Sequence, residues 1–564
     1  MEALDWLVIG VFFLALIGII VWVVRQKQND SADYFLGGRD ATWLAIGASI
    51  FASNIGSEHL IGLAGAGASS GMAMAHWEIQ GWMILILGWV FVPFYTRSMV
   101  YTMPEFLERR YNPQSRTILS VISLVSYVLT KVAVTVYAGG LVFQQVFGIK
   151  ELWGIDFFWI AAIGLVVLTA LYTIFGGMKS VLYTSVLQTP ILLLGSLIIL
   201  VLGFKELGGW DEMMRVCGAV TVNDYGDTMT NLIRSNDDAN FPWLGALIGS
   251  AIIGFWYWCT DQFIVQRVLS GKNEMEARRG TIFGAYLKLL PVFLFLIPGM
   301  IAFALHQKYI GAGGEGFLPT LANGTANADA AFPTLVAKLL PAGVKGLVVC
   351  GILAALMSSL ASLFNSSAML FTIDFYKRFK PETPEKKLVG IGQIATIVIV
   401  VLGILWIPIM RSVGDVLYTY LQDVQSVLAP GIAAAFLLGI CWKRTSAQGG
   451  MWGLIAGMVI GLTRLGAKVY YSNAGEVADS TFKYLFYDMN WLFFCGWMFL
   501  FCIIVVIVVS LATEAPTAEK IQGLVFGTAT KEQKAATRAS WNHWDIIHTV
   551  IILAITAAFY WYFW

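Results

Sequence analysis

The sequence predicts an all-α membrane protein, and three observations support this fold class. Hydrophobic residues make up 58% of the 564 residues, charged residues make up only 13%, and the mean hydropathy is +0.73. The apolar residues are grouped into about fourteen runs of roughly 20 residues, the length at which a helix crosses a bilayer. The formal net charge is only +1, so we expect the lipid bilayer and no nucleic acid as a partner.

The predicted transmembrane helices follow these runs in chain order. They cover residues 4–24, 41–66, 74–96, 117–147, 152–175, 180–203, 243–266, 280–306, 344–366, 388–410, 416–441, 447–467, 488–511 and 543–563. The first run begins with MEALDW, which is acidic and lacks a small-residue cleavage site. We therefore interpret it as a transmembrane helix and not as a signal peptide.

These runs divide the chain into five predicted parts. Residues 1–30 form a peripheral N-terminal helix and residues 31–441 form the core. Residues 442–511 add two transmembrane helices, 512–541 are a polar linker, and 542–564 are a C-terminal transmembrane helix. Lys and Arg are concentrated in every second loop, and such loops lie on the cytoplasmic side. The linker is therefore predicted inside and both termini outside, in a multi-pass protein of the plasma (inner) membrane.

One predicted span, residues 41–66, contains an unusually polar segment, which reads SNIGSEH at 53–59. Ionisable residues inside spans are costly and usually face a cavity or a partner. Asn54 and Gly56 also weaken a helix. A helix interrupted near the middle of the bilayer is how many secondary transporters bind a substrate and its coupling ion. The alternative is a continuous helix whose small residues at 62–67 permit close packing.

Charged residues inside spans are few. They are Glu58 of the segment 53–59, Glu78, Lys131, Asp261 and Lys288, with Asp423 in the span 416–441 and Arg464 near the end of a span. A second polar segment, LAALMSSLASLFNS, covers residues 353–366. On a helix the carbonyl of Ala355 lies near the hydroxyls of Ser358 and Ser359, so three oxygens converge, and oxygen is the ligand of hard cations. Alternatively, the serines simply bond to carbonyls one turn earlier.

Several long motifs resemble the sodium/glucose cotransporter branch of the solute:sodium symporter family. They include DYFLGGR at 33–39, SNIGSEHLIGLAG at 53–65, WYWCTDQFIVQR at 256–267 and MSSLASLFNSSAMLFTIDFY at 357–376. The resemblance implies a LeuT-type core of two inverted five-helix repeats, at about 41–203 and 243–441. It also implies that the first helix of each repeat is discontinuous.

The resemblance also implies two ligand sites. A sodium site would use the backbone carbonyls of Ala52, Ile55 and Ala355 and the hydroxyls of Ser358 and Ser359. A sugar site would use Asn54, His59, Glu78, Lys288 and Gln422, with Tyr257 and Trp258 as an aromatic gate or platform. Such side chains offer both donors and acceptors, as a ring of hydroxyls requires.

Each of these assignments has a simpler alternative that the residues alone leave open. Glu78 and Lys288 would then form a structural ion pair and His59 would be a hydrogen-bonded core histidine. Tyr257 and Trp258 would be ordinary packing or interfacial residues.

The resulting functional prediction is a sodium-coupled symporter of a neutral, glucose- or galactose-like monosaccharide that works by alternating access. A myo-inositol or other polyol symporter is the alternative. More distant alternatives are a sodium symporter for an organic anion or amino acid and a non-transporting sugar sensor. No HExxH motif is present, and we expect no enzyme.

The stoichiometry is predicted as one sodium per sugar. Relatives that couple a second sodium carry an aspartate at the place of Ser185 and a threonine at the place of Ala361. This chain lacks both groups, and a desolvated cation with too few oxygen ligands is costly. Other oxygens, such as those of Ser362 or Thr184, are the alternative ligands for a second ion.

Overall fold

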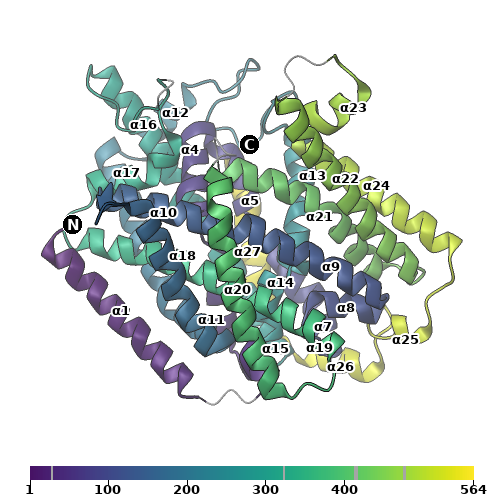
Figure 1. Cartoon of the computed structure of the whole chain (residues 1–564). Helices are drawn as coiled ribbons and strands as arrows, with labels where there is room; N and C mark the ends of the chain where they lie inside the picture. The colour runs from purple at the N-terminus through teal and green to yellow at the C-terminus, as the bar shows by residue number, and fades with distance from the viewer. Residues whose placement is uncertain (27–29, 57, 322–323, 412–416, 474–477) are drawn as a thin grey trace.

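The structure is a computed structural model that describes residues 1–26, 30–56, 58–321, 324–411, 417–473 and 478–564. Within these ranges the side chains of residues 129, 130, 145, 409–411, 417–423 and 473 are not described. The described chain is helical apart from its loops and one small antiparallel hairpin, β1 (Glu151–Leu152) and β2 (Ile155–Asp156) (Figure 1).

The first quarter of the chain forms one long outer helix followed by many short ones. Their bounds are α1 (Ala3–Val24), α2 (Ser31–Leu36), η1 (Gly37–Arg39), α3 (Trp43–Asn54), η2 (Glu58–Leu63), α4 (Ala64–Ser70), η3 (Gly71–Met74), α5 (Ala75–Glu78), α6 (Gly81–Ile86), η4 (Leu87–Phe91), α7 (Val92–Ser98), α8 (Met103–Arg110), α9 (Pro113–Ser126), η5 (Tyr127–Val132) and α10 (Ala133–Phe147).

The middle of the chain begins with the longest helix. It contains α11 (Phe157–Leu207), α12 (Trp210–Gly218), α13 (Trp243–Gly254), η6 (Phe255–Thr260), α14 (Gln262–Leu269), α15 (Glu274–Lys288), η7 (Val292–Leu296), α16 (Ile297–Gly311), η8 (Ala328–Ala330), α17 (Ala331–Leu339), α18 (Val344–Met369), η9 (Leu370–Tyr376) and α19 (Lys377–Phe379).

The last third consists mainly of long helices joined by loops. It contains α20 (Glu385–Arg411), α21 (Leu417–Cys441), α22 (Ala447–Asn473), α23 (Thr481–Lys483), η10 (Tyr484–Asp488), α24 (Trp491–Ala512), α25 (Ala518–Ile521), α26 (Lys531–Ala539) and α27 (His543–Tyr562).

Eleven helical stretches of the described chain are long and apolar enough to cross a membrane. The helix α11 covers the predicted span 180–203 and residues 157–175 of the predicted span 152–175, joined at a kink where Gly177 adopts φ 53° and ψ −148°. Such a positive φ is readily adopted only by glycine. The first residues of the span 152–175, 152–156, belong to the hairpin of β1 and β2 instead. The predicted spans 41–66 and 117–147 contain shorter apolar helices, Trp43–Asn54 and Ala133–Gln144. The prediction of an all-α membrane protein with about fourteen spans therefore agrees with this arrangement.

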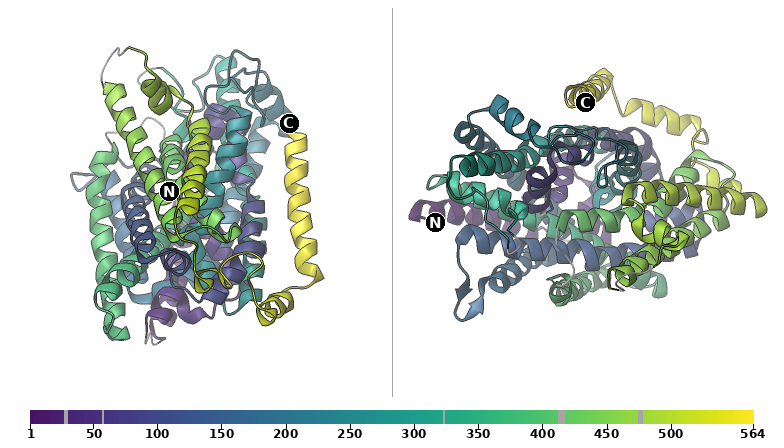
Figure 2. Two further views of the ribbon diagram at one scale, coloured as in Figure 1. Left: turned by 90° about the vertical axis from the view of Figure 1, so that its right-hand side faces the viewer. Right: turned by 90° about the horizontal axis from the view of Figure 1, so that it is seen from above.

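The helices of the predicted core pack around α3 and α18. The helix α3 contacts α11, α15 and α18, and α11 packs along α18. The helix α21, the last of the predicted core, packs on α22 and α24, which follow the core in the chain, and α27 contacts α6 and α15. In both views of Figure 2, α27 lies at the edge of the molecule.

Two helices are interrupted at points that matter for function. The helix α3 ends at Asn54, Ile55 is extended (φ −81°, ψ 104°), and the π-helix η2 begins at Glu58. The second interruption lies at Asp261, which is extended (φ −77°, ψ 127°) between the π-helix η6 and α14. The prediction of an interruption around residues 54–59 is thus confirmed, and the alternative of a continuous helix is wrong.

Candidate functional site

The end of α3 supplies backbone oxygens at the first interruption. An α-helix leaves its last carbonyls without partners inside the helix. The amide of Ile55 donates to the carbonyl of Phe51 at 3.0 Å. The carbonyls of Ala52, Ser53 and Asn54 belong to the last turn of α3, just before the extended residue Ile55.

The predicted sodium ligands lie on two helices that touch. Ala52 and Ile55 stand at the end of α3, and α18 contributes Ala355, Ser358 and Ser359. All five residues are at most 1% exposed. Buried oxygen donors on adjoining helices suit a desolvated hard cation.

A network of hydroxyls surrounds these residues. The Oγ atoms of Ser53 and Ser362 are 2.6 Å apart, and those of Ser185 and Ser358 are 3.2 Å apart. Ser185 also donates its proton to the carbonyl of Val181 at 2.6 Å. Because a hydroxyl has a single proton, Ser358 must supply the proton in its contact with Ser185. The remaining lone pairs of Ser358 are then free to face a cation.

A buried cavity lies directly beside this region. Its walls come from the first interruption, α5, η5, α10, the second interruption, α15, α18 and α21. The lining residues are Asn54, Glu58, His59, Trp77, Glu78, Gln80, Lys131, Val134, Thr135, Ile253, Gly254, Tyr257, Trp258, Phe263, Lys288, Ser359, Leu363 and Gln425.

Most of the predicted substrate residues meet in this cavity. Asn54, His59, Glu78 and Lys288 line it, together with the aromatic pair Tyr257 and Trp258. Ser359 also lines it, so a predicted sodium ligand borders the same space. The remaining predicted residue, Gln422, lies on α21, and its side chain is outside the described residues.

A buried ion pair crosses the cavity wall between α5 and α15. Nζ of Lys288 donates to Oε2 of Glu78 at 2.5 Å, and Nε2 of His59 lies 3.2 Å from the same oxygen. Nζ of Lys288 also lies 5.3 Å above the ring of Trp258. The two charges therefore neutralise each other within the wall, as buried charges require.

Two polar ring atoms of the lining have no hydrogen-bond partner among the described protein groups. They are Nδ1 of His59 and Nε1 of Trp77, and both atoms are buried. Leaving such a group unsatisfied costs about 1–3 kcal/mol. Among the described protein groups, only Nε2 of His59 has polar partners, the side chains of Asn54 and Glu78. Nδ1 of His59 and Nε1 of Trp77 are available to hydroxyl groups of a ligand.

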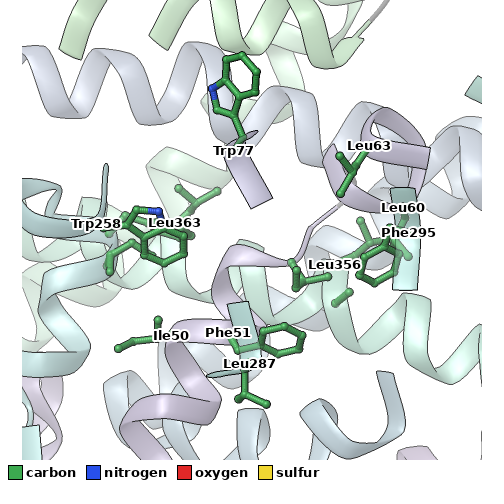
Figure 3. Close-up of a cluster of buried hydrophobic side chains, with 14 of the residues drawn as sticks. Ile50, Phe51, Leu60, Leu63, Trp77, Trp258, Leu287, Phe295, Leu356 and Leu363 are labelled. Atoms are coloured by element: carbon green, nitrogen blue, oxygen red, sulfur yellow. The ribbon is translucent and has the colours of Figure 1, made fainter. Parts of the chain in front are cut away.

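Trp77 is fixed in place by other aromatic rings. Its ring stacks on Trp491 with centroids 5.5 Å apart and meets the edge of Phe241 at 6.2 Å. Figure 3 shows Trp77 and Trp258 on different helices, with Leu363 beside Trp258. The rings offer flat apolar faces of the kind that sugar C–H groups contact.

A second ion pair forms part of the wall at the other interruption. Nζ of Lys131 donates to Oδ2 of Asp261 at 2.6 Å, and the hydroxyl of Tyr127 donates to Oδ1. Nζ of Lys131 also lies 4.8 Å from the ring centre of Tyr257 and 4.7 Å from that of Phe263. The ionisable lining thus includes the pair Glu78–Lys288, the carboxyl group of Glu58, and Lys131, whose partner Asp261 lies behind the lining.

Sequence reasoning left several lining residues without a role. Glu58 and Lys131 stood out as ionisable residues inside spans, and that signal was sufficient to find them. Gln80 donates to the carbonyl of Ser250 at 2.8 Å, a contact that no sequence spacing indicates. Gln425 lies three residues after Gln422 on α21, so helical periodicity would place the two on neighbouring positions of one face.

Comparisons with known proteins agree with this architecture. The profile of the sodium:solute symporter family matches residues 34–457. The mouse protein "Sodium/myo-inositol cotransporter 2" is 37% identical over 542 residues, covering 94% of this chain and 80% of that protein. The zebrafish protein "Sodium/glucose cotransporter 4" is 36% identical over 537 residues, covering 92% of this chain and 80% of that protein.

A solved structure supports the fold. A Na⁺-coupled sialic acid symporter in its substrate-bound outward-open state gives a TM-score of 0.73 at 22% identity, covering 92% of this chain and 99% of that chain. At this identity the likeness concerns the fold, and the LeuT-type fold class is confirmed. The family match, the cotransporter relatives and the membrane helices lead to one conclusion: the chain belongs to the sodium:solute symporter family, in its sodium/glucose cotransporter branch, and is a sodium-coupled symporter rather than an enzyme.

Proposed function

We propose that the substrate is a neutral, polyhydroxylated ring, with a monosaccharide of the glucose or galactose type as the first candidate. The observation that carries this proposal is that both lysines of the cavity lining are paired with a carboxylate. Lys288 is paired with Glu78, and Lys131 with Asp261. Neither lysine is then free for an anionic substrate, whereas hydroxyls can accept from both lysines and donate to Glu78 and to Glu58, the other carboxyl group of the lining.

The neutral groups of the cavity fit the same ligand class. Asn54, Gln80 and Gln425 carry amides that both donate and accept, and the ring nitrogens of His59 and Trp77 have no described protein partner. A site built to bond hydroxyls rejects analogues that lack them. We therefore expect deoxy analogues to bind more weakly than the parent sugars.

A second candidate is a cyclic polyol such as myo-inositol. Curated relatives of this chain include cotransporters named for myo-inositol in mouse and dog, at 37% identity over 542 and 551 residues. Both candidates present a ring of hydroxyls without net charge. The polar groups of the cavity wall can bond to the hydroxyls of either ring, so uptake of both kinds of substrate is to be measured.

Sodium couples to this cavity through a shared wall. The proposed ligands are the carbonyls of Ala52, Ile55 and Ala355 and the hydroxyls of Ser358 and Ser359. Ser359 also lines the substrate cavity, so sodium binding would order a substrate wall and give positive coupling between the two ligands. We propose one sodium per substrate, because Ser185 offers no carboxylate and Ala361 no hydroxyl.

Uptake into proteoliposomes tests the proposal. A sodium gradient should drive accumulation of D-glucose, D-galactose or myo-inositol, and an equal potassium gradient should not. Sialic acid and proline serve as charged and zwitterionic controls, and neither should accumulate. Sodium-driven accumulation of only these controls would overturn the proposed substrate class, and binding without uptake would indicate a sensor. The proposed location is the plasma membrane with both termini outside, which labelling of single terminal cysteines in intact cells tests.

A further inference from the structure

Residues of the short helix α5 contact both the cavity and distant parts of the chain. Trp77 and Glu78 line the cavity, while the preceding residue, His76, does not. The side chain of His76 is 1% exposed and binds two partners from distant parts of the chain. Its Nδ1 lies 3.0 Å from the hydroxyl of Tyr560, and its Nε2 lies 3.1 Å from the carbonyl oxygen of Leu232.

The protonation of His76 follows from these partners. A carbonyl can only accept, so Nε2 of His76 must carry a proton and donate it to Leu232. In the neutral ring Nδ1 is then an acceptor, and the hydroxyl of Tyr560 donates to it. Both polar atoms of the ring are satisfied in one tautomer. Any change at Tyr560 that removes the hydroxyl leaves Nδ1 of His76 buried without this donor.

The two partners of His76 are themselves linked. The amide of Leu232 donates to the carbonyl of Phe563 at 3.1 Å, directly after the last turn of α27. The same loop is bonded to the chain just before α5, since the amide of Met72 donates to the carbonyl of Met229 at 2.8 Å. The loop, the end of α27 and the start of α5 therefore form one closed set of hydrogen bonds.

The helix α5 needs such external support. It has only four residues, and a helix of that length has little stability of its own. The residues that follow it, Ile79 (φ −80°, ψ 23°) and Gln80 (φ −85°, ψ 24°), leave the α-helical conformation. The orientation of Trp77 and Glu78 therefore depends on contacts that α5 makes with other elements.

We propose that His76, Leu232 and Tyr560 form a clamp by which the C-terminal helix α27 positions the substrate-binding residues of α5. His76 is a positioning residue in this proposal, because it acts through Trp77 and Glu78 and does not line the cavity. The inference rests on the proposed function in one respect, namely that Trp77 and Glu78 contact the substrate. It gives α27, which lies at the edge of the molecule (Figure 2), a role in substrate affinity.

A matched pair of tyrosine variants tests the clamp. Tyr560→Phe removes only the hydroxyl that binds His76. Tyr562→Phe removes a hydroxyl two residues away, which accepts from Nε1 of Trp210 at 3.1 Å on the exposed surface. Sodium-driven uptake of D-glucose and of myo-inositol is measured for both variants and normalised to the amount of protein. Tyr560→Phe should raise the half-saturating concentration by about threefold to tenfold, as for one lost buried hydrogen bond, and Tyr562→Phe should leave it unchanged.

Two histidine variants separate positioning from stability. His76→Phe keeps an aromatic ring and loses both bonds, so it should shift half-saturation at least as far as Tyr560→Phe. His76→Gln can still donate to Leu232 and should recover part of the affinity. A lower maximal rate with unchanged half-saturation in His76→Phe and Tyr560→Phe would overturn the clamp.

Amide hydrogen exchange tests the clamp without any substrate. Peptides covering residues 70–80 should exchange faster in His76→Phe and Tyr560→Phe than in the parent and in Tyr562→Phe. Equal exchange in all four proteins would overturn the clamp. If the parent transports neither D-glucose nor myo-inositol, the proposed substrate class is wrong. The exchange measurement still tests whether the clamp positions α5.

Discussion

The two helix interruptions differ in what satisfies their backbone. At Asp261 the carboxylate caps the next helix by accepting from the amide of Phe263 at 3.2 Å, and it is paired with Lys131 and Tyr127. At the first interruption, Ile55 and Gly56 carry no polar side chain. The helix that follows the second interruption is thus capped by a side chain of the protein, whereas we propose that sodium binds the backbone oxygens at the first.

This difference separates two kinds of discontinuity in a membrane helix. Backbone groups freed inside a bilayer must find a partner or face a cavity. Asp261 and its partners make the second interruption a structural joint that also forms part of the cavity wall. The first interruption lies beside Ser358 and Ser359 of α18, and we propose that sodium completes it.

The largest expected effect comes from removing the built-in cap. Asp261→Ala takes away the partner of Lys131 and one of the two acceptors for the amide of Phe263, which also donates to the hydroxyl of Tyr127 at 3.0 Å. Breaking a buried ion pair on one side costs about 3–5 kcal/mol, so we expect a marked fall in the midpoint of thermal unfolding. Asp261→Asn keeps an oxygen that can accept from the amide of Phe263, so its midpoint of thermal unfolding should fall less. An unchanged midpoint in Asp261→Ala would show that the second interruption does not need its own cap.

A large effect on substrate affinity is expected at the other acid–base pair. Lys288→Ala should weaken substrate binding at saturating sodium. Gln422→Ala, at a predicted substrate residue outside this pair, should do the same, and we expect about 1–3 kcal/mol for each lost polar partner. Equilibrium binding of the transported sugar is the measurement. Lys288→Ala also leaves Glu78 without its lysine, so Lys288→Met combined with Glu78→Gln is the control that restores neutrality without restoring affinity. Unchanged affinity in both single variants would remove these residues from the site.

A smaller and more selective effect is expected at the first interruption. Ser359→Ala deletes one proposed sodium ligand, so the sodium concentration for half-maximal uptake should rise by roughly threefold to tenfold. Substrate affinity at saturating sodium should change less. The measurement is uptake against sodium concentration at fixed substrate. If the sodium concentration for half-maximal uptake stays the same while substrate affinity changes, the assignment of Ser359 to the sodium site is wrong.

The smallest expected effect concerns Ser185. Its hydroxyl contacts Ser358 but is not itself a proposed ligand, so Ser185→Ala should shift the sodium curve less than Ser359→Ala does.

The parent protein should move one charge per substrate in voltage-controlled liposomes and should show hyperbolic sodium dependence. A ratio near two with sigmoidal dependence would indicate that other oxygens complete a second ion site.

The membrane class, the approximate spans and the position of the first interruption could be predicted from the residues. These features depend on local properties: the length of apolar runs, and the weak helix propensity of Asn54 and Gly56. The sequence also predicted that Ser358 and Ser359 stand on one helix after Ala355, because helical spacing is fixed. Its motifs indicated the family before any contact was known.

The pairs of polar side chains that contact one another could not be predicted from the sequence and depend on how the helices pack. Lys288 pairs with Glu78, 210 residues away, and Lys131 pairs with Asp261, 130 residues away. The hydrogen bond between His76 and Tyr560 spans 484 residues. Such partners are chosen by how helices pack and how far each is turned about its axis, and no local pattern encodes either quantity. For this reason the sequence indicated the costly polar residues inside the membrane, and the packing decided which of them pair with one another and which face the cavity.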